Sequence, residues 1–298
     1  MKGCSKPSFA TFWAGRRVSP FEAACVASFV RHGYDYTVYS YEEVENLPPG
    51  VASGNAAEIT DEANVRRFLI RGEPNLSHFS DLFRYELFSR TPHIWVDTDM
   101  LMLQPMPPGD YEQLLAREDA RSICGAIMRL DSNDPQLPKL IQRTEALRDR
   151  DLAWGATGPR LLTATFNRRN ILAASYDPER FFPIHYNDFW KVFLPEYRVE
   201  CEALCAGAAT LHLWNDRVGM LGIWKRFGPP AGSFLESRFS ADGSIALFED
   251  LYPAPVMRHM VQNWRFRCEG GDIGLGQWSR RAVPSMKLTL RRRLNLPT

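Results

Sequence analysis

The amino-terminal third of the chain alternates between short β-type runs and an amphipathic helix. Residues 8–13 (SFATFW) form an apolar, β-rich run, and residues 36–39 (YTVY) form a second one. Between them, Phe21, Cys25 and Phe29 recur every four residues, which places them on one face of a helix. Because a strand, a helix and a strand of these lengths make a βαβ unit, we expect the two strands to be parallel, with a right-handed crossover.

Both ends of this helix are marked in the sequence. Ser19 suits the N-cap, Pro20 suits the first helical position, and Glu22 suits the closing position of a capping box. Arg31 places positive charge in the last turn, where it complements the helix dipole. Gly33 suits the left-handed residue that follows a helix, so we expect the helix to end just before it.

Further along, the apolar pattern predicts more elements of both kinds. A helix is expected from Asn75 or Ser77 to Arg90, and residues 93–96 (HIWV) are an apolar run typical of a strand buried on both faces of a parallel sheet. The later predictions are a strand at 122–128, a helix at 136–147, a strand at 210–213 and a Gly/Pro-rich excursion at 228–232. Without internal repeats or a linker, the pattern favours one α/β domain over residues 1–298, with a less regular carboxy-terminal third.

The composition narrows the class of protein. Hydrophobic residues make up 45% and charged residues 24%, as in an ordinary globular domain with a sizeable core. The net charge of +1 gives no global field that would favour nucleic acid. The six cysteines show no paired ligand spacing, which favours a reduced, cytoplasmic compartment over a disulfide framework. No apolar run approaches the roughly 20 residues that span a bilayer, and the first residues do not resemble a signal peptide.

The carboxy-terminal tail, residues 280–298, is basic and rich in leucine. It has six basic residues and no acidic one, and four leucines interleave with them: Arg280, Arg281, Lys287, Leu288, Leu290, Arg291, Arg292, Arg293, Leu294 and Leu296. Such a tail can settle on an anionic membrane surface, which would make the protein peripheral at the inner face of the membrane. A solvated or frayed terminus explains the composition equally well.

Two aspartates follow the apolar run at residues 93–96. A strand delivers Asp97 and Asp99 to the carboxyl edge of the predicted sheet, where ligands bind in open α/β folds. Two carboxylates at this spacing can face one hard divalent cation, Mg²⁺ or Mn²⁺. A turn in which either aspartate caps backbone amides is the alternative. Residues 149–151 (DRD) repeat the pattern at a predicted helix end with no strand before it, and we expect them to be a solvated face.

The helix upstream of these aspartates carries a second polar pair. One face holds Asp81, Arg84, Tyr85 and Phe88, and another holds Phe79, Leu82, Phe83 and Leu87. Asp81 and Arg84 can form a surface ion pair that contributes little. Alternatively, the helix packs beside the Asp97 strand and presents both side chains to a charged, polyhydroxylated ligand, since the planar Arg fork binds oxygens in pairs.

Residues 80–106 (SDLFRYELFSRTPHIWVDTDMLMLQPM) resemble the core motif of glycosyltransferase family 32, the DXD-containing sugar transferases. These include yeast mannosyltransferases, animal α-1,4-galactosyltransferases and bacterial polysaccharide enzymes, and the clostridial glucosylating toxins share the arrangement. An SDxxR helix precedes an apolar strand and DxD, and sixteen residues separate Asp81 from Asp97, as in the toxins. Pro92 and His93 stand where Gly-Gly is common, and Trp95 where Tyr is usual, which could alter the contact with the sugar ring.

Three further segments carry the resemblance, which runs from about residue 9 to residue 215. Residues 12–15 (FWAG) are similar to the family's first strand and turn, where an aromatic residue, here Trp13, contacts the nucleotide base. A core position is the alternative for Trp13. Residues 154–159 (WGATGP) are similar to the TGP segment that helps close the active site, and Gly158 belongs to it. A helix start capped by Thr157 is the alternative there.

The third segment is residues 211–215 (LHLWN), which resemble the family's late strand and turn. In the family this segment brings a third ligand to the metal, so His212 and Asn215 are both candidates. For His212, a satisfied core histidine between two leucines is the alternative.

The resemblance implies a GT-A type fold, a Rossmann-like mixed sheet flanked by helices, and retaining transfer of a hexose from a nucleotide sugar with Mn²⁺ or Mg²⁺. It assigns Asp99 to the metal, Asp97 to the ribose and a metal-bound water, and Asp81 and Arg84 to the sugar hydroxyls. A UDP-sugar donor is favoured, with a glycan, glycolipid or polysaccharide acceptor, although a protein acceptor remains open. Because no residue stands out as a nucleophile, we expect same-face transfer assisted by the leaving diphosphate.

Two other functions compete with this interpretation. A sugar-nucleotide pyrophosphorylase would carry a Gly-rich signature with a GxGTR-like core after the first strand, and residues 14–17 read AGRR instead. A non-catalytic nucleotide-sugar or carbohydrate-binding protein would have less need of the whole set of Asp81, Arg84, Asp97 and Asp99. The sequence therefore favours an enzyme.

Overall fold

The computed structural model of the chain describes residues 6–166, 175–268 and 286. The chain divides into two compact units, Met1–Met257 and Arg258–Thr298. The second unit contributes the end of helix α10, which spans Ala254–Cys268. Apart from Met286, the basic tail lies outside the described residues, so its membrane contact stays a prediction.

The first unit alternates short strands and helices along most of its length. The strands are β1 (Phe9–Phe12), β2 (Tyr36–Ser40), β3 (Ala52–Asn55), β4 (Phe68–Ile70), β5 (Glu73–Pro74), β6 (Ile94–Val96), β7 (Met100–Met102), β8 (Leu114–Arg117), β9 (Ile123–Arg129), β10 (Arg150–Asp151) and β11 (Thr210–His212). The α-helices are α1 (Pro20–Arg31), α2 (Leu76–Arg90), α3 (Leu137–Glu145), α4 (Pro159–Phe166), α6 (Pro178–Phe181), α7 (Arg198–Cys205), α8 (Asn215–Leu221) and α9 (Phe234–Ala241). Five 3₁₀ turns are described, namely η1 (Ala56–Glu58), η2 (Glu62–Arg66), η4 (Phe189–Phe193), η5 (Pro195–Tyr197) and η6 (Ser244–Leu247).

The main sheet has six strands in the order β3-β2-β1-β6-β9-β8. The first four run parallel to one another, and β9 is antiparallel to both β6 and β8. Phe9 lies beside Tyr36 in the parallel pair β1 and β2, which confirms the predicted βαβ unit around α1. The fold is therefore mixed α/β, with a six-stranded mixed sheet flanked by helices, and is compatible with a Rossmann-like fold.

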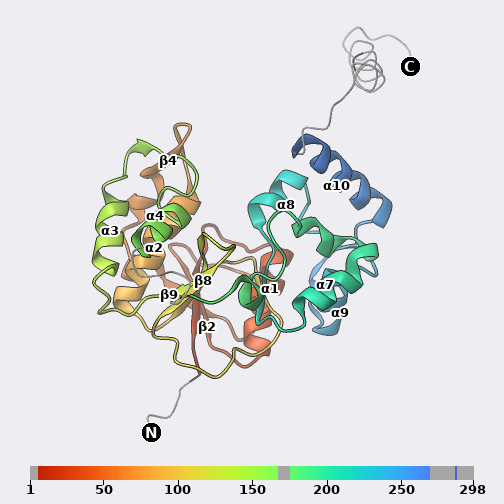
Figure 1. Cartoon of the computed structure of the whole chain (residues 1–298), viewed down its shortest axis with the longest axis horizontal. Helices are drawn as coiled ribbons and strands as arrows, with labels where there is room; N and C mark the ends of the chain where they lie inside the picture. Colours follow the sequence, from red (N-terminus) through yellow and green to blue (C-terminus); the bar gives the residue numbers. More distant parts are fainter. Residues whose placement is uncertain (1–5, 167–174, 269–285, 287–298) are drawn as a thin grey trace. The chain divides into compact units, whose positions relative to one another are not determined.

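Helices cover both faces of this sheet (Figure 1). Alternate residues of β1 supply the two cores, because successive strand side chains point to opposite faces. Phe9 packs against Phe29 of α1, with ring centroids 4.8 Å apart. Phe12 packs on the other face against Phe79 and Phe83 of α2, each with centroids 5.0 Å apart. Burial of each such ring contributes roughly 1.5–3 kcal/mol.

Helix α1 begins at Pro20 as predicted, but its capping box does not form. Ser19 is the N-cap and has extended backbone angles, yet its hydroxyl donates to the Glu22 carboxylate instead of accepting from a backbone amide. Glu22 is only 1% exposed, and it also accepts hydrogen bonds from Asn215 and Lys225. The capping-box prediction was wrong because distant parts of the chain hold the Glu22 carboxylate.

Helix α2 matches the predicted span closely. Asn75 is its N-cap, and the side chain accepts a hydrogen bond of 3.0 Å from the amide of His78. The helix is exposed at both ends but largely buried from His78 to Phe88, on both of the faces that the sequence distinguishes. The helix therefore lies within the core, between the sheet and α3.

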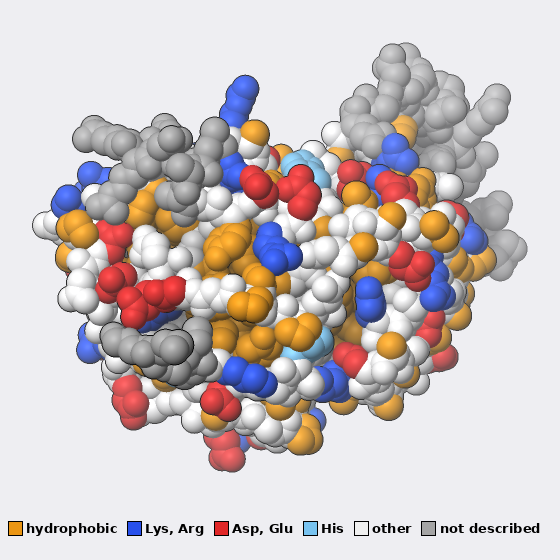
Figure 2. Space-filling model, turned by 60° about the horizontal axis from the view of Figure 1, so that its bottom comes forward, with side chains coloured by type: hydrophobic (Ala, Val, Ile, Leu, Met, Phe, Trp, Pro, Cys, Tyr) orange, Lys and Arg blue, Asp and Glu red, His pale blue; other side chains and the backbone are white. Residues whose placement is uncertain are grey.

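Figure 2 shows one face of the molecule, whose chain has a net charge of +1. On the face drawn in Figure 2, acidic and basic side chains are interspersed without an extended area of one sign. Within the described residues, every helix is too short or too polar to cross a membrane.

Candidate metal centre and cleft

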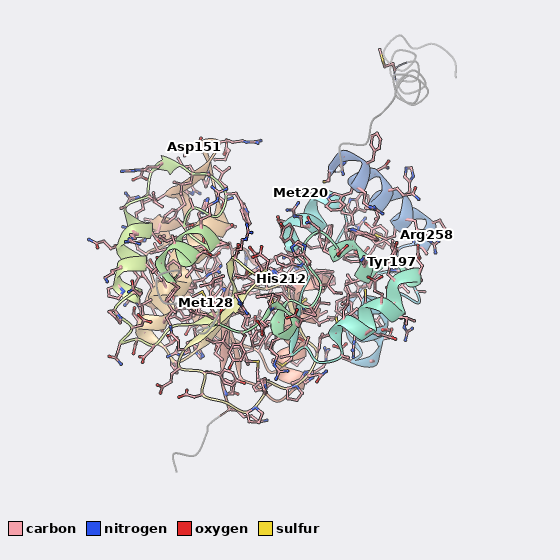
Figure 3. All side chains as sticks on the ribbon, viewed as in Figure 1. Met128, Asp151, Tyr197, His212, Met220 and Arg258 are labelled. Carbon is pink, nitrogen blue, oxygen red and sulfur yellow. The ribbon has the colours of Figure 1, made fainter. Side chains whose placement is uncertain are left out.

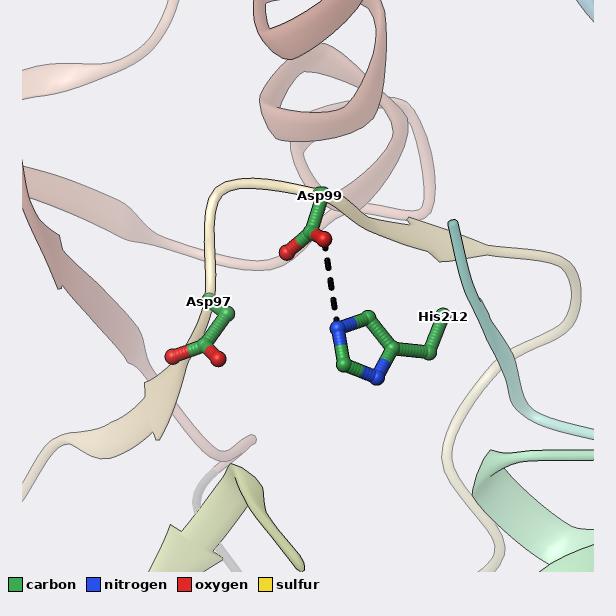
Figure 4. Close-up of side chains that lie close together, drawn as sticks. All are labelled: Asp97, Asp99 and His212. Atoms are coloured by element: carbon green, nitrogen blue, oxygen red, sulfur yellow. Dashed lines mark ion pairs between the residues drawn. The ribbon is translucent and has the colours of Figure 1, made fainter. Parts of the chain in front are cut away.

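Asp97, Asp99 and His212 meet just beyond the carboxyl end of β6. Strand β6 ends at Val96, and a tight turn follows, in which the amide of Met100 donates to the Asp97 carbonyl at 3.1 Å. Strand β11 pairs antiparallel with β7 and places His212 opposite Met100. One ligand atom from each of the three side chains lies within 4.8 Å of the others, and all three face a shared space (Figure 4). This group could bind a metal ion.

The Asp99 carboxylate already has two partners. His212 Nε2 lies 3.2 Å from Asp99 Oδ2, and the amide of Asn215 donates to the same oxygen at 2.7 Å. Burial lowers the pKa of His212, but the neighbouring Asp99 carboxylate and Cys124 together raise it by more, so this pKa lies well above its usual range. Burial raises the pKa of Asp99, whereas His212, the backbone amide of Asn215 and Lys225 together lower it by more. Without a metal the two groups therefore form an ion pair, and a cation has to displace the imidazole proton.

The donor atoms suit a hard or borderline divalent cation. Two carboxylates and one imidazole supply oxygen and nitrogen ligands of the kind that Mn²⁺ accepts and that Mg²⁺ accepts in part. The side-chain carbonyl oxygen of Asn215 is buried and has no hydrogen-bond partner among the described groups. It lines the same cleft as His212, while the Asn215 side-chain nitrogen donates to Glu22 at 3.0 Å. Both predicted candidates for the third ligand therefore lie at this end of the cleft.

Arg84 connects α2 to this centre. Its guanidinium donates to the Asp97 carboxylate at 3.2 Å, to the Gly125 carbonyl at 2.6 Å and to the Ser80 carbonyl at 3.2 Å. It also lies 3.5 Å from the Asp81 carboxylate. Asp81 and Arg84 are 6% and 5% exposed, so the surface ion-pair interpretation was wrong. The packing of α2 beside the Asp97 strand is confirmed, and Arg84 fixes the Asp97 carboxylate, whereas the presentation of Asp81 and Arg84 to a charged, polyhydroxylated ligand stays a prediction.

The segment around Thr157 contacts the Asp81 carboxylate and holds it in place. The Thr157 hydroxyl donates to the Asp81 carboxylate at 2.7 Å and is bonded to His78 Nδ1 at 2.5 Å. A Cβ on Gly158 would lie 2.7 Å from the same carboxylate, so only glycine fits at this position. Gly158 thus lies against the Asp81 carboxylate and is not among the residues that line the cleft. Burial raises the pKa of Asp81 to about 6, although Arg84 and Thr157 each act to lower this pKa.

Trp95 occupies the position where the family resemblance has Tyr. It is 2% exposed, and its indole nitrogen donates to Asp97 at 2.7 Å. The Arg84 guanidinium lies 4.8 Å from its ring centroid, close enough for a cation–π contact. Trp95 therefore helps to orient both Asp97 and Arg84.

One cleft has a volume of about 410 Å³, and its lining includes Asp81, Arg84, Trp95, Asp97, Asp99, His212 and Asn215. Trp13 lies in its wall and in the wall of a neighbouring cavity of about 490 Å³. Trp154 also lines the cleft and is 58% exposed. The cleft is large enough for a small charged ligand.

The second DxD copy has a different environment. Asp149 pairs with Arg67 on the surface, and residues 150–151 form the short strand β10, which runs parallel to β4. All three residues of this copy are exposed, and only a turn separates Asp149 from the end of α3 at Glu145, so the copy follows a helix rather than a strand, both as expected. In Figure 3, Asp151 lies well away from His212.

Several residues of the site had no recognisable signal in the sequence. His78 looks like an ordinary helical residue, and Glu22 looks like part of a capping box. Glu118, which follows β8 and lines the cleft, has no motif around it. His78 and Glu22 bond to residues far along the chain, and Glu118 meets the rest of the cleft only in the folded protein, so spacing alone could not reveal them.

Neither protein-family models nor curated proteins match the sequence.

Proposed function

We propose that the chain is a metal-dependent, retaining glycosyltransferase of GT-A type that moves a hexose from a nucleotide sugar to a glycan, glycolipid or polysaccharide acceptor. The observation that carries the proposal is the grouping of Asp97, Asp99 and His212 within 4.8 Å, with Arg84 bonded to Asp97 in the same cleft. The mixed sheet flanked by helices is compatible with this fold type.

In this proposal Asp97, Asp99 and His212 or Asn215 hold Mn²⁺ or Mg²⁺. When bound, such an ion neutralises charge on the departing diphosphate, a contribution of several kcal/mol in typical metal catalysis. The cleft has a volume of about 410 Å³ and is lined by Trp13, Asp81 and Arg84, which supports the proposal that a nucleotide sugar binds there.

The chain's own residues then divide the remaining work. Trp13 stacks on the nucleotide base, for which its place between the cleft and the neighbouring cavity is suitable. Asp81 accepts hydrogen bonds from the sugar hydroxyls, and Arg84 holds Asp97 while it faces the donor. Asp97 also receives the ribose hydroxyl. Transfer on one face of the sugar leaves the anomeric configuration retained, and a UDP-sugar is the favoured donor.

A binding panel tests this function directly. Thermal shift is measured with UDP, GDP and free hexoses, with and without Mn²⁺, and nucleotide release is then followed with UDP- and GDP-hexoses. We expect a shift that needs both a nucleotide and Mn²⁺, followed by slow release of nucleotide. Stabilisation by free hexose alone would instead indicate a carbohydrate-binding protein without turnover, and stabilisation by nucleotide without metal would contradict the proposal.

A further inference from the structure

The cleft contains one acidic side chain that the site does not use. Among the described residues, the carboxylates that line the cleft belong to Asp81, Asp97, Asp99, Glu118 and Asp216. The first three are bonded within the site, and Asp216 lies 3.8 Å from the Arg217 guanidinium. The Glu118 carboxylate has no hydrogen bond or ion pair with any described group. It is therefore the acidic side chain of the cleft left available to a ligand.

The surrounding loop holds Glu118 in place. Glu118 directly follows β8, and its amide donates to the Ser122 carbonyl at 3.0 Å across the hairpin to β9. Asp119 closes the loop by accepting hydrogen bonds from the amides of Arg121 and Ser122 at 2.6 and 2.8 Å. Before Glu118, the buried Arg117 is paired with Asp177. The backbone on both sides is thus fixed, and the partly buried Glu118 side chain faces the cleft.

Burial and the neighbouring charged groups place the pKa of the Glu118 carboxyl near neutral pH. Burial raises the pKa of Glu118 to about 7, and Asp119 adds to the rise. His212 of β11 lowers this pKa and Asp216 of α8 raises it, while Cys124 of β9 is a further titratable neighbour. A carboxyl group poised near the working pH is well suited to take up and release a proton.

We propose that the Glu118 carboxylate accepts a hydrogen bond from the attacking hydroxyl of the acceptor and takes its proton during transfer. This assignment rests on the proposed function. The acceptor oxygen forms a bond to the anomeric carbon, and the bond from that carbon to the diphosphate oxygen breaks with its electron pair leaving on the diphosphate. The hydroxyl proton passes to Glu118 rather than to the departing diphosphate, and Glu118 later returns it to water.

The assignment separates the two substrates within the cleft. Asp81 and Arg84 belong to α2, whereas Glu118 follows β8 and interacts electrostatically with His212 and Asp216. The donor sugar is proposed to contact the α2 side chains, so the acceptor hydroxyl meets the carboxylate that the donor leaves free. Glu118 is thereby a catalytic residue that touches the acceptor.

The test compares Glu118→Gln with Glu112→Gln, an exposed carboxylate before the same strand. Transfer is measured from a panel of UDP- and GDP-hexoses to p-nitrophenyl hexosides, together with Mn²⁺ binding and the pH profile of kcat. For Glu118→Gln we expect kcat to fall by roughly 100-fold or more, the range of general-base catalysis. The donor KM and Mn²⁺ affinity should stay at wild-type values, and the acidic limb of the pH profile should disappear.

A second measurement does not depend on turnover. Infrared titration of the metal-free protein should show a carboxyl group titrating near pH 7 in the wild type and in Glu112→Gln, and this band should be missing from Glu118→Gln. Transfer by Glu118→Gln at the wild-type rate, with the acidic limb intact, would overturn the assignment and leave the proposed function standing. A wild-type protein that binds no nucleotide with Mn²⁺ and transfers from no donor would overturn both.

Discussion

The His212 imidazole meets the Asp99 carboxylate, with 3.2 Å between Nε2 and Oδ2, because strand β11 pairs with β7 in one particular register. That register sets His212 opposite Met100, the residue after Asp99. A shift by one residue would turn His212 to the other face of the ribbon, since strand side chains alternate. The centre is thus a product of long-range strand pairing as much as of the DxD tripeptide.

Gly125→Ala should disable the site without unfolding the chain. A Cβ at position 125 would lie 2.3 Å from Arg84 Nη1, and Arg84 is fixed by its bonds to Ser80, Gly125 and Asp97. Displacement of the guanidinium releases Asp97, so nucleotide release should fall by about tenfold or more, as when a positioned catalytic group moves. The control is Gly207→Ala, where an added Cβ meets nothing within 4 Å. Equal activity of the two variants would show that Arg84 does not position Asp97.

Asp81→Asn should make the protein more stable at neutral pH. The folded-state pKa of Asp81, about 6, lies above its ordinary value of 3.8, so the fold favours the protonated form. The stability that protonated Asp81 contributes is therefore fully present below about pH 4. It is lost as the pH rises to about 6 and stays lost at higher pH. The loss is on the order of 3 kcal/mol. Since Asn cannot ionise, the variant escapes this loss.

Urea unfolding of both proteins at pH 4, 5.5 and 7 measures the effect. The advantage of Asp81→Asn should be absent at the lowest pH and largest at the highest, while nucleotide release is lost throughout. A variant less stable than the wild type at pH 7 would mean that the ion pair with Arg84 outweighs the burial of the Asp81 carboxylate.

Glu22→Gln should weaken the metal centre from outside the cleft. The buried Glu22 carboxylate accepts from the Asn215 side chain at 3.0 Å and pairs with Lys225, and the Asn215 amide in turn bonds to Asp99. Loss of a buried hydrogen bond to a charged group typically costs about 1.5–3 kcal/mol. We expect a lower melting temperature and weaker Mn²⁺ binding. The exposed Glu43→Gln should change neither quantity, and unaltered Mn²⁺ binding by Glu22→Gln would remove this link.

The sequence predicted those parts of the fold that local pattern determines. The apolar run at 93–96 and the stripe of Phe21, Cys25 and Phe29 became β6 and α1, because each has one consistent periodicity. The capping box expected from Ser19 and Glu22 does not form, because Glu22 also binds two partners about 200 residues away and local propensity yields to such tertiary contacts.

The residues of the candidate site also include some that the sequence indicated and others that it did not. Asp97 and Asp99 stand at a recognisable strand end, and the resemblance nominated His212, which joins them in the structure. Glu118 was missed, because only the assembled cleft reveals that its carboxylate has no partner among the residues that the structure describes. The roles of Trp13, Asp81 and Asn215 toward a ligand stay predictions.

The central claim, that Asp97, Asp99 and His212 hold a divalent cation, is tested most directly by Mn²⁺ binding measured by electron paramagnetic resonance. The comparison is between the wild type, Asp99→Asn and Asp151→Asn, where the last variant alters the exposed DxD copy. We predict that the wild type and Asp151→Asn bind Mn²⁺ with the same affinity and that Asp99→Asn binds it at least about tenfold more weakly. Equal binding by Asp99→Asn and the wild type, or weakened binding by Asp151→Asn alone, would contradict the account.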